Sequence, residues 1–231
     1  MKKVIAFSLW GDNKNYTIGA IKCAKAAKSL YPNFECWFYI HKETVPNSII
    51  DALSQLDNVQ IILKEGDLTK CKPMTWRFEA IDHPDVEVLL SRDTDARFTI
   101  REKLAVDEWL NSTCSFHIMR DHPHHNFLIL GGMFGTRKIK SIPSWTFLIG
   151  NLVQKGDRNY DQDFLRDLIY PEIKDTSIIH ATFHKFEKNS IDFPIPYDSE
   201  FRFVGEYIYH DDTRSKSHIM NLLLSLAAMN T

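Results

Sequence analysis

The sequence lacks the features that mark several large classes of protein. Its four cysteines, Cys23, Cys36, Cys71 and Cys114, show no CxxC spacing, which argues against a disulfide framework and against a zinc knuckle. The formal net charge is only -2, so no broad cationic surface points to a nucleic acid as partner. We therefore expect reduced thiols, a cytoplasmic location and no nucleic-acid partner.

Long apolar runs are also missing. The N-terminal run at residues 4–7 stops at Ser8 and is too short for the core of a signal peptide. The apolar tail at residues 219–229 is far shorter than the ~20 residues of a spanning helix. We expect no transmembrane segment and interpret the tail as a packed terminal helix, with a membrane-surface foot as the alternative. No repeat or linker divides the chain, which indicates one domain.

Strand-like and helix-like segments alternate through the first half. Apolar or aromatic runs predict strands at residues 3–8, 34–40, 59–63 and 87–90. Helical spacing or an initial proline predicts helices at residues 17–30, 46–56 and 73–81. Thr17 is the expected N-cap of the first helix. The alternation predicts an α/β fold with a mostly parallel, Rossmann-like central sheet flanked by helices.

The second half carries fewer clear signals. We expect helices at residues 101–110, 144–153 and 161–168 and strands at residues 115–119 and 177–180. An apolar segment at residues 127–130 ends in the run GGMFG at residues 131–135, and Gly131 with Gly132 is expected to form a turn. The aromatic and proline-bearing segment 192–209 is expected to wrap the body as loops and edge strands.

Two carboxylates follow the predicted strand 87–90 directly, in the sequence SRDTD. The end of such a strand lies at the carboxyl edge of the sheet, where open α/β folds bind ligands. Asp93 and Asp95 point the same way in an extended chain and can share one hard cation, Mn²⁺ or Mg²⁺. In the structural alternative, Asp93 caps the next helix and Asp95 forms a salt bridge with Arg92, Arg97 or Arg101.

Several blocks of sequence around this pair resemble a family of nucleotide-sugar-dependent glycosyltransferases with the GT-A fold and an Asp-x-Asp motif. The blocks are residues 7–11, WRF at 76–78, SRDTDAR at 91–97, REKLAVDEWL at 101–110, HIMRDHP at 117–123 and GGMFG at 131–135. The resemblance covers most of the first 170 residues. It implies a single GT-A-like domain over residues 1–231, with a nucleotide-binding half at residues 1–100 and a sugar or acceptor half at residues 101–231.

The resemblance further implies a metal-dependent transferase that acts on a UDP- or GDP-sugar and on a glycan or other hydroxyl acceptor. Asp93 and Asp95 would hold the cation on the donor diphosphate, where positive charge stabilises the leaving group. By the same analogy, the residues expected around the nucleotide base and ribose are Phe7, Ser8, Trp10 and Tyr16. Arg77 is expected to reach the phosphates or the acidic loop; the alternative is an ion pair with Glu79 or Asp82.

A third metal ligand, often a histidine, is implied late in such folds. The candidates are His180, His184 and His210, and we favour His180 because a strand end holds a ligand rigidly. The alternative is a half-buried histidine bonded to backbone. Ala181 stands where the resemblance leads us to expect an aspartate.

The sugar or acceptor pocket is expected around the histidine-rich loop 122–125. Adjacent histidines do not easily converge on one tetrahedral zinc ion, so we prefer this pocket to a zinc site. Arg120 and Asp121 are its expected polar contacts, and a solvated loop without a function is the alternative. Gly131 and Gly132 would let the backbone approach a bound sugar closely.

The candidate catalytic carboxylates are Asp161, Asp163 and Asp121. The first two belong to a DQD segment that resembles helix starts in several retaining transferases, and favourable charge at a helix N-terminus is the alternative. Retention or inversion stays open, because several carboxylates could serve as general base.

Two other functions stay open besides the transferase. One is a metal-dependent nucleotidyl or phosphoryl transferase, although the sequence contains no phosphate-binding loop. The other is a catalytically silent carbohydrate- or nucleotide-binding module.

Overall fold

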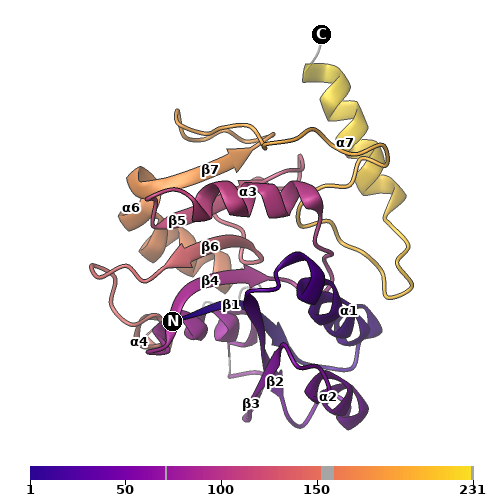
Figure 1. The fold of residues 1–231 in the computed structure, drawn as a ribbon, viewed down its shortest axis with the longest axis vertical. Coiled ribbons are helices and arrows are strands. Elements are labelled where there is room, and N and C mark those ends of the chain that lie inside the picture. The colour runs from indigo at the N-terminus through magenta and orange to yellow at the C-terminus, as the bar shows by residue number, and fades with distance from the viewer. Residues whose placement is uncertain (71, 152–158, 230–231) are drawn as a thin grey trace.

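The computed structural model describes residues 1–70, 72–151 and 159–229, and within them a seven-stranded sheet forms the centre of the molecule (Figure 1). The strand order is β3-β2-β1-β4-β6-β5-β7. The strands are β1 (Lys2–Leu9), β2 (Phe34–His41), β3 (Val59–Lys64), β4 (Val86–Arg92), β5 (Phe116–Arg120), β6 (Met133–Arg137) and β7 (Ser177–Ala181). Only β6 runs antiparallel to its neighbours, β4 and β5, so the sheet is mostly parallel, as the sequence predicts.

Helices cover both faces of the sheet. The helices of the described residues are α1 (Lys14–Leu30), α2 (Asn47–Ser54), the 3₁₀ helix η1 (Pro73–Asp82), α3 (Ile100–Leu110), α4 (Trp145–Gly150), α5 (Tyr160–Phe164), the π-helix η2 (Leu165–Ile169), α6 (Tyr170–Ile173), the 3₁₀ turn η3 (Lys174–Thr176) and α7 (Lys216–Met229), of which α7 lies apart from the sheet. Strand β1 shows how the two layers arise. Ile5, Phe7 and Leu9 pack with α1 to α3, whereas Val4 and Ala6 pack with η1, α4 and α5. Alternate side chains of a strand point to opposite faces, so one apolar strand serves two cores.

The order in which strands are added across the sheet reverses between β1 and β4. From β1 the chain proceeds to β2 and β3 on one side, and β4 then pairs with β1 on the other side. Ligands of open α/β sheets bind outside the carboxyl ends of the strands at such a switch point. Residues that follow β1 and β4 therefore occupy the position where a site is expected.

The structure corrects one local prediction, the N-cap of the first helix. Helix α1 begins at Lys14 and its N-cap is Asn13, whose side chain accepts a hydrogen bond from the Asn15 N–H at 2.9 Å, so Thr17 is not the cap. Gly131 and Gly132 form a turn, as expected, and the residues that follow form β6. Gly135 lies within that strand, where an added Cβ would come 2.7 Å from the Trp109 ring. Close packing against the Trp109 ring therefore requires a glycine at position 135.

The predicted helix 144–153 corresponds to α4, which ends at Gly150; residues 152 and 153 lie outside the described residues, as does Cys71. Helix α7 is present but only loosely packed. Leu222 is its one buried residue among those described, while Met220 and Leu224 are more than half exposed, and α7 extends away from the sheet (Figure 1). Among the described residues no helix combines the length and apolar character needed to cross a bilayer.

Candidate functional site

A cavity of about 1060 Å³ opens at the carboxyl ends of β1 and β4, at the switch point of the sheet. It gathers most of the residues that the sequence predicts for donor and metal binding, together with Asp161, one of the predicted catalytic carboxylates. These are Ser8, Trp10, Tyr16, Arg77, Asp93, Asp95, Gly131, Gly132 and Asp161. They come from six separate stretches of the sequence, and the sheet brings them to one place.

Arg77 is the buried cation of this cavity. Helix η1 packs against β1 and β4, and the backbone N–H of Arg77 donates to the Ser8 hydroxyl at 3.1 Å. Its Nη1 forms an ion pair with Asp93, and its Nη2 lies 3.6 Å from an Asp161 carboxylate oxygen. The predicted contact with the acidic loop is therefore present. The alternative partners are engaged elsewhere: Glu79 pairs with Lys64, and Asp82 caps α4.

Asp95 has no such partner. Within the described part of the chain its carboxylate forms no ion pair. Burial, with added repulsion from Asp93, raises the pKa of Asp95 to about 7. The salt bridges proposed as its structural alternative do not form, because the three arginines pair with other acids: Arg92 with Glu102, Arg97 with Asp212 and Arg101 with Asp121.

Asp161 lies at the N-terminus of α5 and is almost completely buried. Burial raises the pKa of Asp161 to about 6, although Arg77 opposes the increase. Its Oδ1 atom is buried and has no hydrogen-bond partner among the described residues. A buried carboxylate oxygen without a hydrogen bond destabilises the folded protein, and a bound ligand that donates a hydrogen bond to it would remove that penalty.

The two glycines leave room for these acids. A Cβ on Gly132 would lie 1.8 Å from Asp93 Oδ2, and one on Gly131 would lie 2.4 Å from Asp161 Oδ2. In addition, the Gly131 carbonyl accepts a hydrogen bond from the Ser91 hydroxyl at 2.6 Å, which ties the segment to the end of β4. The absence of side chains at these positions is a steric requirement of the site.

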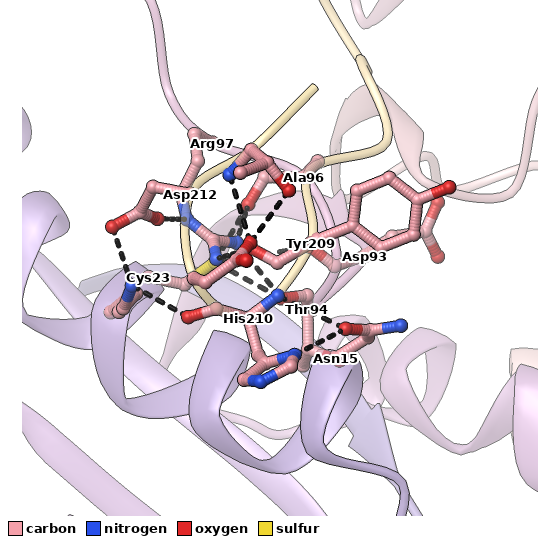
Figure 2. A network of polar contacts seen from close by, with 12 residues as sticks. Asn15, Cys23, Asp93, Thr94, Ala96, Arg97, Tyr209, His210 and Asp212 are labelled. Atoms are coloured by element: carbon pink, nitrogen blue, oxygen red, sulfur yellow. Dashed lines mark hydrogen bonds and ion pairs between the residues drawn. The ribbon is translucent and has the colours of Figure 1, made fainter. Parts of the chain in front are cut away.

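Contacts with α1 and with the C-terminal segment fix the loop of residues 93–97, as Figure 2 shows. The Cys23 thiol of α1 donates to the Ala96 carbonyl at 3.2 Å, and Arg97 Nε lies 3.3 Å from Asp212 of the C-terminal segment. Asp212 in turn pairs with Lys22 at 2.5 Å. Asp93 is not a helix cap, since Thr99 caps α3. The acidic loop is thus fixed between α1 and residues 207–213.

Some predicted residues lie outside the cavity. Phe7 is fully buried and stacks on Phe38, because its position on β1 points toward the α1 layer while Ser8 points to the cavity. Asp163 is partly exposed, does not line the cavity and pairs with Arg166 at 2.6 Å. Phe7 and Asp163 therefore contact residues outside the cavity, and we do not assign them to the site.

Arg120 and Asp121 also require a correction, because both are completely buried and paired. Arg120 binds the Glu187 carboxylate through two hydrogen bonds of 2.8 Å. Asp121 receives hydrogen bonds of 2.9 and 2.8 Å from Arg101, and further ones from Thr182, Tyr197 and Val204. They anchor the histidine-rich loop and do not line the cavity.

His180 is not brought to the carboxylates. It is completely buried on β7, where Nδ1 lies 2.9 Å from His117 Nε2 and Nε2 lies 3.3 Å from Glu108. The other candidates, His184 and His210, bond to the Pro123 carbonyl and to Asn15. None of the three lines the cavity. The structure therefore supplies no histidine ligand from among them, which matches the departure at Ala181.

Several cavity residues carry no signal that sequence reasoning used. Among them are Leu68, Thr69, Met74, Tyr160 and Gly205. His125 is a different case. It belongs to the histidine-rich loop, and it lines the cavity where its neighbours Arg120 and Asp121 do not. One member of the loop, His125, therefore faces the cavity, and only the fold reveals which member that is.

The donor set fits a hard divalent cation. Asp93 and Asp161 share the guanidinium of Arg77, and Asp95 has no ion pair, so carboxylate charge exceeds guanidinium charge in the cavity. Among the described residues no group of three or more His, Cys, Asp or Glu side chains is arranged to hold a metal ion. Two carboxylates that leave the remaining positions to waters and a phosphate ligand are the usual protein contribution for Mg²⁺.

No family model and no curated protein sequence matches the chain. Its fold does match solved structures. One is a glycosyltransferase involved in the glycosylation of the major capsid of PBCV-1, with a TM-score of 0.50 and 14% identity over 78% of this chain and 82% of that chain. Another is a putative glucose-1-phosphate thymidylyltransferase from Bacillus anthracis, with a TM-score of 0.50 and 9% identity over 87% of this chain and 99% of that chain.

The chain has a single-domain, GT-A-like fold. At these low identities the likeness establishes the fold, and the chemistry must be argued from the site.

Proposed function

We propose that the protein is a metal-dependent glycosyltransferase that moves a sugar from a nucleoside-diphosphate sugar to a hydroxyl acceptor. One observation carries the proposal. A large cavity at the switch point of the sheet combines Asp95, which forms no ion pair among the described residues, with the buried pair of Arg77 and Asp161, on a fold like that of a glycosyltransferase. This combination suits a diphosphate ligand bridged by a divalent cation.

Asp93 and Asp95 would hold Mn²⁺ or Mg²⁺. When bound, the cation would neutralise negative charge on the leaving nucleoside diphosphate. Arg77 would bind phosphate oxygens, since its guanidinium already lies between two carboxylates in the same cavity. The protein therefore supplies both charge partners that a diphosphate needs.

Residues of the first half would bind the nucleoside. Trp10 and Tyr16 are partly exposed aromatic side chains on the cavity wall, and Ser8 lies beside them at the end of β1. Flat aromatic rings suit stacking on a base, and a hydroxyl suits a ribose. We propose residues 1–100 as the nucleotide-binding half and the remainder as the sugar and acceptor half.

Asp161 is the proposed carboxylate near the reacting centre. It is buried in the cavity with an unsatisfied oxygen, and its raised pKa is typical of groups that handle protons. Gly131 beside it would allow a sugar to approach the backbone. These features support a role for Asp161 in contacting the transferred sugar or the acceptor hydroxyl.

A nucleotidyltransferase is the second candidate, favoured by the fold likeness to a putative thymidylyltransferase. Such an enzyme would use the same acids on a nucleoside triphosphate and release pyrophosphate. The two reactions differ in their products, so a single set of assays separates them.

The deciding experiment screens UDP- and GDP-sugars with Mn²⁺ and measures the release of UDP or GDP, and in parallel offers nucleoside triphosphates with sugar phosphates. We expect release of UDP or GDP from at least one donor, and a loss of about 100-fold or more in Asp95→Asn. Asp57→Asn is the matched control, because Asp57 is exposed and pairs with Lys28 far from the cavity. Pyrophosphate release alone would favour the second candidate, and turnover of neither would indicate a binding module.

A further inference from the structure

The two ring nitrogens of His125 have different surroundings. Nδ1 accepts a hydrogen bond from the backbone N–H of Asp121 at 3.1 Å. A neutral ring that accepts at Nδ1 carries its proton on Nε2. Burial, with added repulsion from His122, lowers the pKa of His125 to about 3, so the ring is neutral at physiological pH. His125 is therefore a fixed N–H donor.

Nε2 is accessible from the cavity. The side chain lines the cavity beside Leu130, Met133 and Gly205, although His125 is only 9% exposed. Nε2 forms no hydrogen bond with any described residue, and it is not among the fully buried polar atoms that lack a partner. Its proton can therefore be donated only to water or to a ligand in the cavity.

Neighbouring groups hold the ring in place. The Phe203 ring lies 5.9 Å from the His125 ring between centroids, and the His122 ring lies 5.6 Å away. Asp121, whose N–H fixes Nδ1, is itself bound by Arg101 through two hydrogen bonds. A donor locked in this way loses little rotational freedom when a ligand binds, which makes it suitable for selecting one ligand geometry.

We propose that the Nε2–H of His125 donates a hydrogen bond to a hydroxyl oxygen of the sugar in the cavity and so helps to select that sugar. The inference rests on the proposed glycosyltransferase function and adds a specificity residue to it. A protonated Nε2 cannot ligate a cation, and phosphate oxygens are drawn to the charged Arg77. A neutral hydroxyl oxygen is a suitable acceptor for this neutral N–H donor. The same hydroxyl can in turn donate a hydrogen bond to an acceptor such as Asp161 Oδ1.

Two substitutions separate this role from a purely structural one. In His125→Asn, the amide oxygen replaces Nδ1 and keeps the bond to the Asp121 N–H, but no donor reaches the cavity. In His125→Gln, the amide N–H lies near the position of Nε2, whereas the acceptor for Asp121 is lost. His124→Asn is the matched control, because His124 is exposed and bonds to Asn221 on α7.

We expect kcat/KM for the nucleotide sugar to fall about 10- to 100-fold in His125→Asn and to be largely retained in His125→Gln, while Kd for UDP or GDP with Mn²⁺ stays unchanged in both. The control should match the wild type. Full activity in His125→Asn together with loss in His125→Gln would overturn the proposal, because the ring would then serve only the Asp121 N–H.

Nitrogen NMR of the His125 ring tests the inference without turnover. We expect a proton on Nε2 and a shift of its resonance with UDP-glucose, UDP-galactose, GDP-mannose or the free monosaccharides, but none with UDP or GDP. A proton on Nδ1, or no shift with any sugar, would overturn the inference. A shift with a sugar in a protein that turns over no nucleotide sugar would instead remove the proposed function and leave the sugar contact standing.

Discussion

The guanidinium of Arg77 forms an ion pair with the carboxylate of Asp93, the first acid of the Asp-x-Asp triplet. The same guanidinium lies 3.6 Å from Asp161, which belongs to a helix more than sixty residues further along the chain. Arg77 thereby joins the acidic loop to the opposite side of the cavity. Because both Arg77 and Asp161 are almost completely buried, this small network governs stability as well as ligand binding.

Substitution of Arg77 by Met tests the charge balance of the cavity. The variant leaves Asp93 and Asp161 without their cation, which is expected to cost about 3–5 kcal/mol and to lower Tm by roughly 6–20 °C. Mn²⁺ should restore part of this loss, since it supplies positive charge to the same acids. Thermal unfolding with and without Mn²⁺ measures both effects.

Arg166→Met is the control for this experiment. Arg166 also pairs with two acids, Asp163 and Asp167, but on the surface, where an ion pair contributes at most about 1 kcal/mol. An Arg77→Met protein with the same Tm as the control, or with a Tm that Mn²⁺ does not raise, would contradict the charge balance described for the cavity.

Gly132→Ala tests the steric requirement beside Asp93. A Cβ at this position would lie 1.8 Å from Asp93 Oδ2, so the carboxylate must move. We expect the Mn²⁺-dependent affinity for UDP or GDP to fall about tenfold or more, as a displaced ligand reduces metal affinity. Gly150→Ala should bind like the wild type, because a Cβ at Gly150 meets nothing within 4 Å. Equal affinities in the two variants would show that Mn²⁺-dependent nucleotide binding does not depend on the position of the Asp93 carboxylate.

Asp161 gives a pH dependence of folding stability. Its pKa is raised from 3.8 to about 6, so between about pH 4 and pH 6 the folded protein retains a proton that the unfolded chain has lost. Stability from this group therefore falls as the pH rises through that range. Asp161→Asn removes the fall, and its Tm relative to wild type should increase from pH 4 to pH 7 by the equivalent of about 2 kcal/mol.

A flat difference for Asp161→Asn would mean that its carboxyl titrates at an ordinary pH in the folded protein.

The sequence predicted the elements that depend on local periodicity. Strands β1 to β4 and the acidic loop after β4 follow from apolar runs and their ends, and the parallel sheet then brings Ser8 and Asp93 to one edge. Phe7 lies in the core and not at the nucleotide, because successive side chains of a strand point to opposite faces and a shift of one residue decides between core and cavity. The family resemblance could identify neither the buried state of Asp121 nor that of His180.

Contacts between distant segments account for the remaining differences. The Asp121 carboxylate accepts hydrogen bonds from side chains up to 76 residues away, including Thr182 and Tyr197, and His180 contacts His117 on a neighbouring strand. No local pattern encodes such partners. The inward direction of His125 likewise depends on the Asp121 N–H and on the Phe203 ring, both of which become neighbours only in the folded chain.

Calorimetric titration of UDP and GDP, with and without Mn²⁺, into wild type and Asp95→Asn tests the central claim most directly. The wild type should bind one of the two diphosphates at least about tenfold more tightly with Mn²⁺. The gain should be larger at pH 8 than at pH 6, because the pKa of Asp95 is about 7 and a cation requires the ionised carboxylate. Asp95→Asn should lose the gain while it remains folded. Equal affinity with and without Mn²⁺, or an undiminished gain in the variant, would contradict a divalent cation held by Asp93 and Asp95.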